Sequence, residues 1–138
     1  MKLITFISAG AFIFFSGFVM KKENSKQQTL YDTKWTLKKI HIADSTEAIT
    51  GTAFIRFNQE KKSAGGNGGC NTFGSSITVS GNKISFKDIF STQMFCEGVQ
   101  QTEDAFFKQL EKVNRFQVKD KVLFLYKEKE VLLEFEKE

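Results

Sequence analysis

The chain lacks proline altogether, and among its 138 residues it has only two cysteines, one tryptophan and one histidine. Because His41 is the only imidazole, a zinc site made of several histidines is excluded, as is any mechanism that needs two imidazoles. Nothing in the sequence indicates a cofactor, and none is expected.

Charge of one sign is not in large excess either. The formal net charge is +4, but Lys2, Lys21, Lys22 and Glu23 lie in the first 24 residues, and without them 17 basic and 15 acidic residues leave a net charge of +2. A domain this balanced offers nucleic acid little electrostatic attraction, so no nucleic-acid partner is expected.

Phenylalanine is abundant, and the N-terminal segment holds a large share of it, with five of the 16 phenylalanines in the first twenty residues. In that segment Lys2 precedes an uncharged run over residues 3–20. A positive start followed by an apolar stretch is typical of a secretion signal, and this run is also nearly long enough to span a bilayer. We therefore assign residues 1–22 to a signal peptide or a membrane anchor, with cleavage left open, and predict export.

A lipid anchor at this signal is excluded by its chemistry. Phe15-Ser16-Gly17 is like the start of a lipoprotein box, but Phe18 stands where the lipidated cysteine would be, and no thiol precedes Cys70. Contact with a membrane is therefore expected only through residues 3–20, if they are not cleaved. Residues 23–29 are polar and aperiodic, and we predict that they form a tether.

Residues 30–138 are predicted to form one domain rich in β-strands. Trp35 and Leu37 alternate with polar residues, and Ile40 continues the apolar face after an irregularity. Two alternating runs on either side of Ser80-Gly81-Asn82 predict a hairpin. Further strand-like runs cover residues 53–58, 115–118, 121–126 and 131–135.

One principal helix is predicted over residues 102–114. Thr102 can cap it, and Glu103 lies in the first turn, where the helix dipole favours a negative charge. Phe106 and Leu110 recur at helical spacing. Strands, a helix and further strands predict an α+β fold whose mainly antiparallel sheet is strongly curved and barrel-like.

Residues 65–74 hold five glycines, which admit two interpretations. Such a loop can cradle a phosphate with its backbone N–H groups, or it can be a structural turn or bulge that needs positive φ angles. No Gly-Lys-Ser/Thr ending is present, and the segment leads toward a strand over residues 76–79 rather than into a helix. The structural turn is therefore favoured.

Cys70 and Cys96 are the only cysteines. In an exported chain two cysteines most often pair, so a Cys70–Cys96 disulfide is favoured. Three alternatives stay open: a resting thiol pair, a nucleophilic Cys70 activated by His41, and a zinc site that includes all three residues but would be one ligand short of a tetrahedron.

Three stretches in combination resemble one known family: Gly69-Cys70-Asn71-Thr72-Phe73, Ser91-Thr92-Gln93-Met94-Phe95-Cys96, and Glu103-x-x-Phe106-x-x-x-Leu110. With the early Trp35-x-Leu37 and the closing Val131-Leu132-Leu133-x-Phe135, they are similar to the META domain family, which includes the HslJ-type heat-shock proteins. The resemblance covers about residues 30–136. It implies a compact sheet-rich domain with a helix, export to the bacterial cell envelope (periplasmic or membrane-anchored), and an association with stress or antibiotic tolerance. It implies no reaction.

We interpret the motif residues as structural and assign none of them to catalysis. Trp35 and Met94 are expected in the core, Thr92 in a turn, and His41 on a strand facing solvent. Asn71 is expected to hydrogen-bond its own backbone and so to fix the loop that carries Cys70. The full set is Trp35, Gly69, Cys70, Asn71, Phe73, Thr92, Met94, Cys96, Glu103, Phe106 and Leu110.

Three functions from different classes follow. The leading hypothesis is a non-enzymatic exported domain, expected to be a monomer, that supports stress tolerance by binding an unknown envelope protein or ligand. The second is an apolar small-molecule carrier, because 11 phenylalanines outside the signal could line a closed sheet. The third is a thiol-dependent enzyme or a protease inhibitor, whose exposed rigid loop would be residues 65–76.

Overall fold

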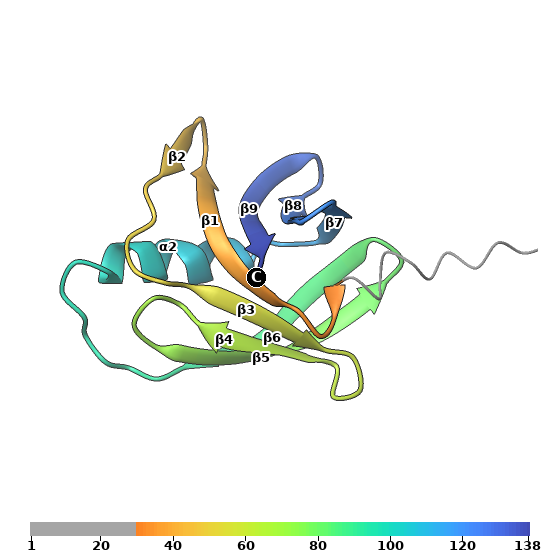
Figure 1. Ribbon diagram of the computed structural model, residues 1–138, viewed down its shortest axis with the longest axis horizontal. Helices are drawn as coiled ribbons and strands as arrows, with labels where there is room; N and C mark the ends of the chain where they lie inside the picture. Colours follow the sequence, from red (N-terminus) through yellow and green to blue (C-terminus); the bar gives the residue numbers. More distant parts are fainter. Residues whose placement is uncertain (1–29) are drawn as a thin grey trace, which may run out of the picture.

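The computed structural model describes residues 30–138, which form a nine-stranded sheet and the helix α2 (Figure 1). The predicted signal or anchor over residues 1–22 and the tether over residues 23–29 lie outside the described residues. Among residues 30–138, no helix has both the length and the apolar character that crossing a bilayer requires. The elements are β1 (Lys34–Ile42), β2 (Ser45–Glu47), β3 (Phe54–Asn58), β4 (Ser63–Asn67), β5 (Thr72–Ser80), β6 (Lys83–Ser91), α2 (Gln100–Leu110), β7 (Arg115–Lys119), β8 (Val122–Lys127) and β9 (Glu130–Lys137).

The sheet curves until its ends meet. All neighbouring strands are antiparallel, in the order β2-β1-β3-β4-β5-β6-β7-β8-β9, and β1 also pairs with β9. The β6–β7 contact is the narrowest, with the single register pair Lys83↔Arg115. The result is a continuous ring of hydrogen bonds without a regular barrel. The predicted α+β fold with a curved, mainly antiparallel sheet is confirmed.

Strand β1 contains the irregularity that its apolar pattern predicted. Its pairing with β9 shifts register between Leu37 and Lys39, so that two successive residues face outward before Ile40 turns inward. Trp35 is fully buried, and its Nε1 donates a hydrogen bond to the Leu30 carbonyl at 3.0 Å. Its predicted place in the core is confirmed, and it connects the start of the described chain to the sheet.

Helix α2 packs on β1 and β9 and supplies aromatic rings to the core. The Phe106 ring lies 5.5 Å from the Phe73 ring, 5.4 Å from Phe107 and 6.1 Å from Phe135, centroid to centroid. Edge-to-face and tilted arrangements of this kind are favourable for aromatic pairs. These phenylalanines therefore fill the space between the helix and the sheet.

The predicted principal helix near residues 102–114 is confirmed, although its bounds are shifted and the predicted cap was wrong. It covers Gln100–Leu110 rather than residues 102–114, and its N-cap is Val99, which makes no side-chain capping bond. Thr102 is buried inside the first turn, where its Oγ1 accepts a hydrogen bond from the Thr50 amide at 3.2 Å. After Leu110 the chain continues in a tighter turn that still buries Val113, so the apolar spacing extends past the helix end.

Close approach of backbones explains one of the glycines in residues 65–74. Gly66 lies opposite Ile55 in the β3–β4 ladder, and a Cβ on Gly66 would collide with the backbone carbonyl of Phe54. At the β5–β6 hairpin, by contrast, Gly81 has a φ of +60° with open space around it. The first glycine is required by packing and the second by backbone conformation.

We predict that Gly66→Ala lowers the free energy of unfolding by about 1–3 kcal/mol, because the added methyl forces two paired strands apart. Denaturant unfolding followed by circular dichroism measures the change. The matched control is Gly81→Asn, which should be close to neutral because asparagine tolerates positive φ and meets no neighbour there. Equal stability of the Gly66→Ala and unmodified proteins would contradict the packing argument.

Candidate functional site

The turn between β4 and β5, residues 68–71, is the centre of the candidate site. Its Gly68 amide donates to the Asn71 carbonyl at 2.9 Å, and the Asn67 side chain accepts from the Gly69 amide at 2.7 Å. Gly69 has a φ of +121°, a conformation that favours glycine. The glycine-rich segment is thus a structural turn between two strands, as favoured from the sequence.

Two backbone N–H groups of this turn bind a carboxylate of the protein itself, that of Glu103. Glu103, on the first turn of α2, is only 2% exposed. Its Oε2 accepts hydrogen bonds from the amides of Cys70 at 2.9 Å and Asn71 at 2.6 Å, and its Oε1 accepts from Asn71 Nδ2 at 2.6 Å. The phosphate-cradle interpretation therefore has no free amides at these two positions.

Glu103 was interpreted from the sequence as a charge at a helix start, and that account missed its main partners. Its position in the first turn is confirmed, but its carboxylate points into the protein and binds a turn 32 residues away in sequence. The signal that could have revealed this was the joint occurrence of the Gly-Cys-Asn and Glu-x-x-Phe motifs. Motif residues far apart in sequence meet at one place here.

Asn71 is 3% exposed and connects this turn to the segment after β6. Its Oδ1 accepts from the Thr92 hydroxyl and from the Met94 amide, both at 2.8 Å. Its Nδ2 donates to the Met94 carbonyl at 2.9 Å as well as to Glu103. All four hydrogen bonds of the side-chain amide are made, which fixes its orientation. The expectation that Asn71 bonds its own backbone was wrong, because its side chain binds the residue 92–94 backbone and hydroxyl instead.

A disulfide adds a covalent connection beside Asn71. Cys70 and Cys96 are bonded, with their Cα atoms 5.8 Å apart and a sequence separation of 26. Closing a loop of that size stabilises a fold by roughly 3–4 kcal/mol in the chain-entropy description. The predicted pairing is confirmed. With both sulfurs bonded to each other, neither is free to attack a substrate or ligate zinc in this structure.

His41 lies away from the cysteines and does not simply face solvent. It is half-buried on β1, with its Nε2 2.8 Å from Glu134 Oε1 and its Nδ1 3.3 Å from the Thr46 hydroxyl. Its expected place on a strand is confirmed, but the predicted free exposure was wrong because β9 brings Glu134 alongside. Within residues 30–138, no group of three or more His, Cys, Asp and Glu side chains is arranged to hold a metal ion.

The segment from Phe90 to Phe95 contains two hydrogen-bond partners of Asn71, namely Thr92 and Met94, and it exposes large apolar side chains. Phe90 is 70% exposed, Met94 60% and Phe95 79%. Phe90 covers Gly74, where a Cβ would collide with its ring. The expected core position of Met94 was wrong, because Asn71 holds the Met94 backbone while its side chain extends outward. We refer to residues 90–95 as the exposed apolar segment.

The structure divides the motif residues into two groups. Those around the turn connect it to α2 and to the segment after β6, while the others fill the core, where Phe73, Phe106 and Leu110 are buried with Trp35. The first group consists of Gly69, Cys70, Asn71, Thr92, Met94, Cys96 and Glu103.

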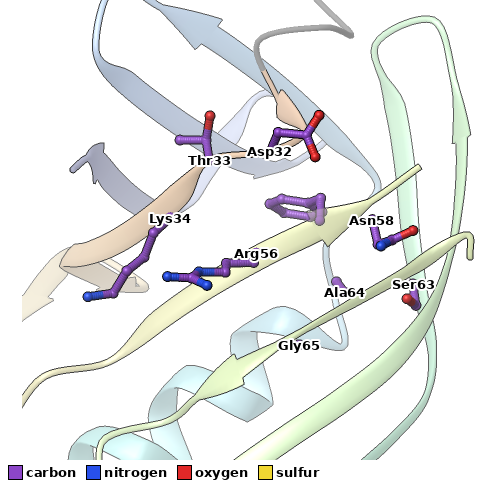
Figure 2. Close-up of a pocket in the computed structure, with 9 residues that line it drawn as sticks. Asp32, Thr33, Lys34, Arg56, Asn58, Ser63, Ala64 and Gly65 are labelled. Atoms are coloured by element: carbon purple, nitrogen blue, oxygen red, sulfur yellow. The ribbon is translucent and has the colours of Figure 1, made fainter. Parts of the chain in front are cut away.

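A separate depression of about 640 Å³ lies at the start of β1 and along β3 and β4 (Figure 2). Lys34 and Arg56 extend side by side from neighbouring strands at one end of it, and Asp32 lies at the other. Lys34 Nζ already donates a hydrogen bond to Glu138 Oε1 at 2.7 Å, and this bond, with a second from the Thr36 hydroxyl, lowers the pKa of that carboxyl. Ligand sites are mostly apolar with a few polar groups, whereas charged and polar residues dominate this lining.

The closed antiparallel ring, helix α2 packed on it and the disulfide-bonded turn define a small α+β domain. The chain belongs to the META domain family, whose model matches residues 28–138. A protein from Burkholderia xenovorans, solved by NMR, is 24% identical, with a TM-score of 0.69 over 80% of this chain and 85% of that one. A second NMR structure is 18% identical, with a TM-score of 0.58 over 79% of this chain and 92% of that one. Both likenesses concern the fold. A comparison with curated proteins found no match.

We predict that Glu103→Gln lowers the free energy of unfolding by about 1–3 kcal/mol. A glutamine can place its oxygen toward the two backbone amides, but its NH₂ group then meets Asn71 Nδ2, another donor. Flipping Asn71 would break its contacts with Thr92 and Met94 instead. Denaturant unfolding measures the loss. The neighbouring exposed substitution Asp104→Asn should stay within about 0.5 kcal/mol of the unmodified protein, and equal effects of the two would refute the account.

Proposed function

We propose that this protein is a non-enzymatic, exported domain of the bacterial cell envelope that binds a partner protein through the exposed apolar segment. The observation that carries the proposal is the exposure of Phe90, Met94 and Phe95 in a segment that is held in place from inside. Aromatic residues and methionine are enriched in protein interfaces, so their exposure in a fixed segment supports a binding role.

Rigidity favours this surface over an ordinary exposed loop. Ordering a flexible segment on binding costs conformational entropy, and a segment already held in one conformation avoids much of that cost. Here the buried pair Asn71–Glu103 and the Cys70–Cys96 bond hold the chain beneath the exposed side chains. The interior phenylalanines, by contrast, pack on one another, which supports a protein partner over an apolar cargo.

Export and a role in stress tolerance complete the proposal. The uncharged run over residues 3–20 after Lys2 and the disulfide-bonded cysteines support an oxidising compartment outside the cytoplasm. Membership in the META domain family supports an association with envelope stress or antibiotic tolerance.

We expect Phe95→Ser to reduce capture of the envelope partner by about tenfold or more, since an aromatic side chain at the centre of an interface often contributes over 1.4 kcal/mol. Full-length protein is cross-linked in intact cells, purified, and its attached proteins are quantified by mass spectrometry. Ile42→Ser is the control, because Ile42 is another exposed apolar residue but lies on β1. The same captured proteins in the same amounts for both variants would refute the proposed surface.

Export is tested separately by the intact mass of protein recovered from the envelope, before and after reduction. We expect a chain that begins near residues 21–25, or the full-length chain if the segment is an anchor. In either case the mass should be two hydrogens below that of the reduced form. Free thiols in a full-length chain recovered from the cytoplasm would contradict export.

A further inference from the structure

The five residues Thr92–Cys96 form an exposed connection held at three points. They lie in the loop that joins β6 to α2, at the left of Figure 1. At its start, the Thr92 amide donates to the Thr72 carbonyl at 3.0 Å. In its middle, Asn71 binds both the amide and the carbonyl of Met94. At its end, Cys96 is bonded to Cys70.

This arrangement leaves Phe95 presented to the outside. The backbone polar groups of Met94 face inward to Asn71, so the Met94–Phe95 peptide carbonyl is already bound. Phe95 is the most exposed of the large hydrophobic residues described, at 79%. Neither its amide nor its carbonyl makes a hydrogen bond to another residue of the 30–138 region. An extended binding cleft could therefore reach both its ring and its backbone.

Two consecutive residues hold the two sides of one peptide bond. Asn71 holds Met94, just before Phe95, and its neighbour Cys70 holds Cys96, just after Phe95. If the Phe95–Cys96 bond were cut, neither new end could move away, because one is held by hydrogen bonds and the other by the disulfide. The new carboxyl end at Phe95 and the new amino end at Cys96 would therefore stay side by side, which favours re-formation of the peptide bond between them.

We propose that residues 92–96 are a substrate-like inhibitory loop for a serine endopeptidase whose primary pocket accepts an aromatic side chain, with Phe95 in that pocket. This rests on the proposed function, and names the class of partner for the same exposed surface. Clefts that receive extended segments use main-chain hydrogen bonds for affinity and side-chain pockets for specificity, and a preorganised segment binds at a lower entropic cost.

The chemistry is reversible at each step. The peptidase serine oxygen attacks the Phe95 carbonyl carbon, and its proton passes through the peptidase histidine to the Cys96 nitrogen as the C–N bond breaks. The Cys96 amine stays beside the acyl group because the disulfide holds it. It can attack the ester, return the proton to the serine oxygen and re-form the peptide bond, which competes with hydrolysis by water.

The sequence placed an inhibitory loop at residues 65–76, and the structure corrects this position. Residues 63–67 and 72–80 are strands β4 and β5, and Asn71 and Phe73 are buried. That stretch supports the exposed segment from within, and the accessible connection is the one that follows β6.

The test uses the full-length protein with its disulfide intact against chymotrypsin and subtilisin, with hydrolysis of a chromogenic peptide as the readout. We expect competitive inhibition of at least one of them and only slow cleavage, confined to the Phe95–Cys96 bond. Phe95→Gly should weaken inhibition by roughly 30-fold or more, as for removal of a central aromatic anchor. Ile42→Ser, which alters an exposed apolar residue on β1 outside the exposed apolar segment, should leave inhibition unchanged.

A second comparison separates an inhibitor from a poor substrate. Thr92→Val removes only the hydroxyl bond to Asn71 at an exposed position, so the fold is retained. We expect this variant, and the reduced but still folded protein, to be cleaved faster at Phe95 than the unmodified oxidised protein. Circular dichroism before each assay confirms the fold.

The inference is overturned if the protein inhibits neither chymotrypsin nor subtilisin. It is also overturned if the oxidised protein is cleaved at Phe95 as fast as an unstructured peptide of the same sequence is cleaved. In that event, Phe95-dependent capture of another envelope protein would leave the proposed function standing. Loss of Phe95 dependence in both experiments would overturn both proposals.

Discussion

The structure depends on one constraint, which is that a buried carboxylate must be satisfied. Glu103 lies almost out of reach of water, where an unpaired negative charge is very costly. Its partners are two backbone amides of a turn and the side-chain amide of Asn71. The turn must therefore take the one conformation that points consecutive amides at the helix, and glycine at position 69 permits it. Helix, turn and sheet become a single unit through three hydrogen bonds to one residue.

The ring of strands and the contacts around Glu103 and Asn71 stabilise different parts of the domain. Closing the sheet from β1 round to β9 reduces the exposed edges that would otherwise attract other chains, although β2 has β1 as its one neighbour in the described sheet and the β6–β7 contact is narrow. The ring leaves a long connection between β6 and α2 that no strand supports. The Asn71 side chain, which acts like a strand neighbour for Met94, and the disulfide supply that support. The connection between β6 and α2 is thereby held in one conformation although it belongs to no strand or helix.

Much of the fold could be predicted because it follows from local patterns. Alternation at Trp35 and Leu37, the irregularity before Ile40 and the turn at Gly81 are properties of a few adjacent residues, and each is found where expected. Glu103 and Met94 were misinterpreted for one shared reason. Their environments are set by partners more than twenty residues away, through hydrogen bonds that leave no periodic trace in the sequence. The sequence pattern of a carboxylate in the first turn of a helix is the same whether the side chain faces water or a buried amide.

The adjacency of Cys70 and Asn71 has a consequence for how such a domain can diverge. Because neighbouring residues hold positions 96 and 94, an insertion or deletion in either segment would break both connections at once, so the length of residues 92–96 is constrained. The side chain at position 95 touches neither connection. Selection is free to exchange that one residue while the framework stays as it is, and related chains could acquire different partners by substitution alone.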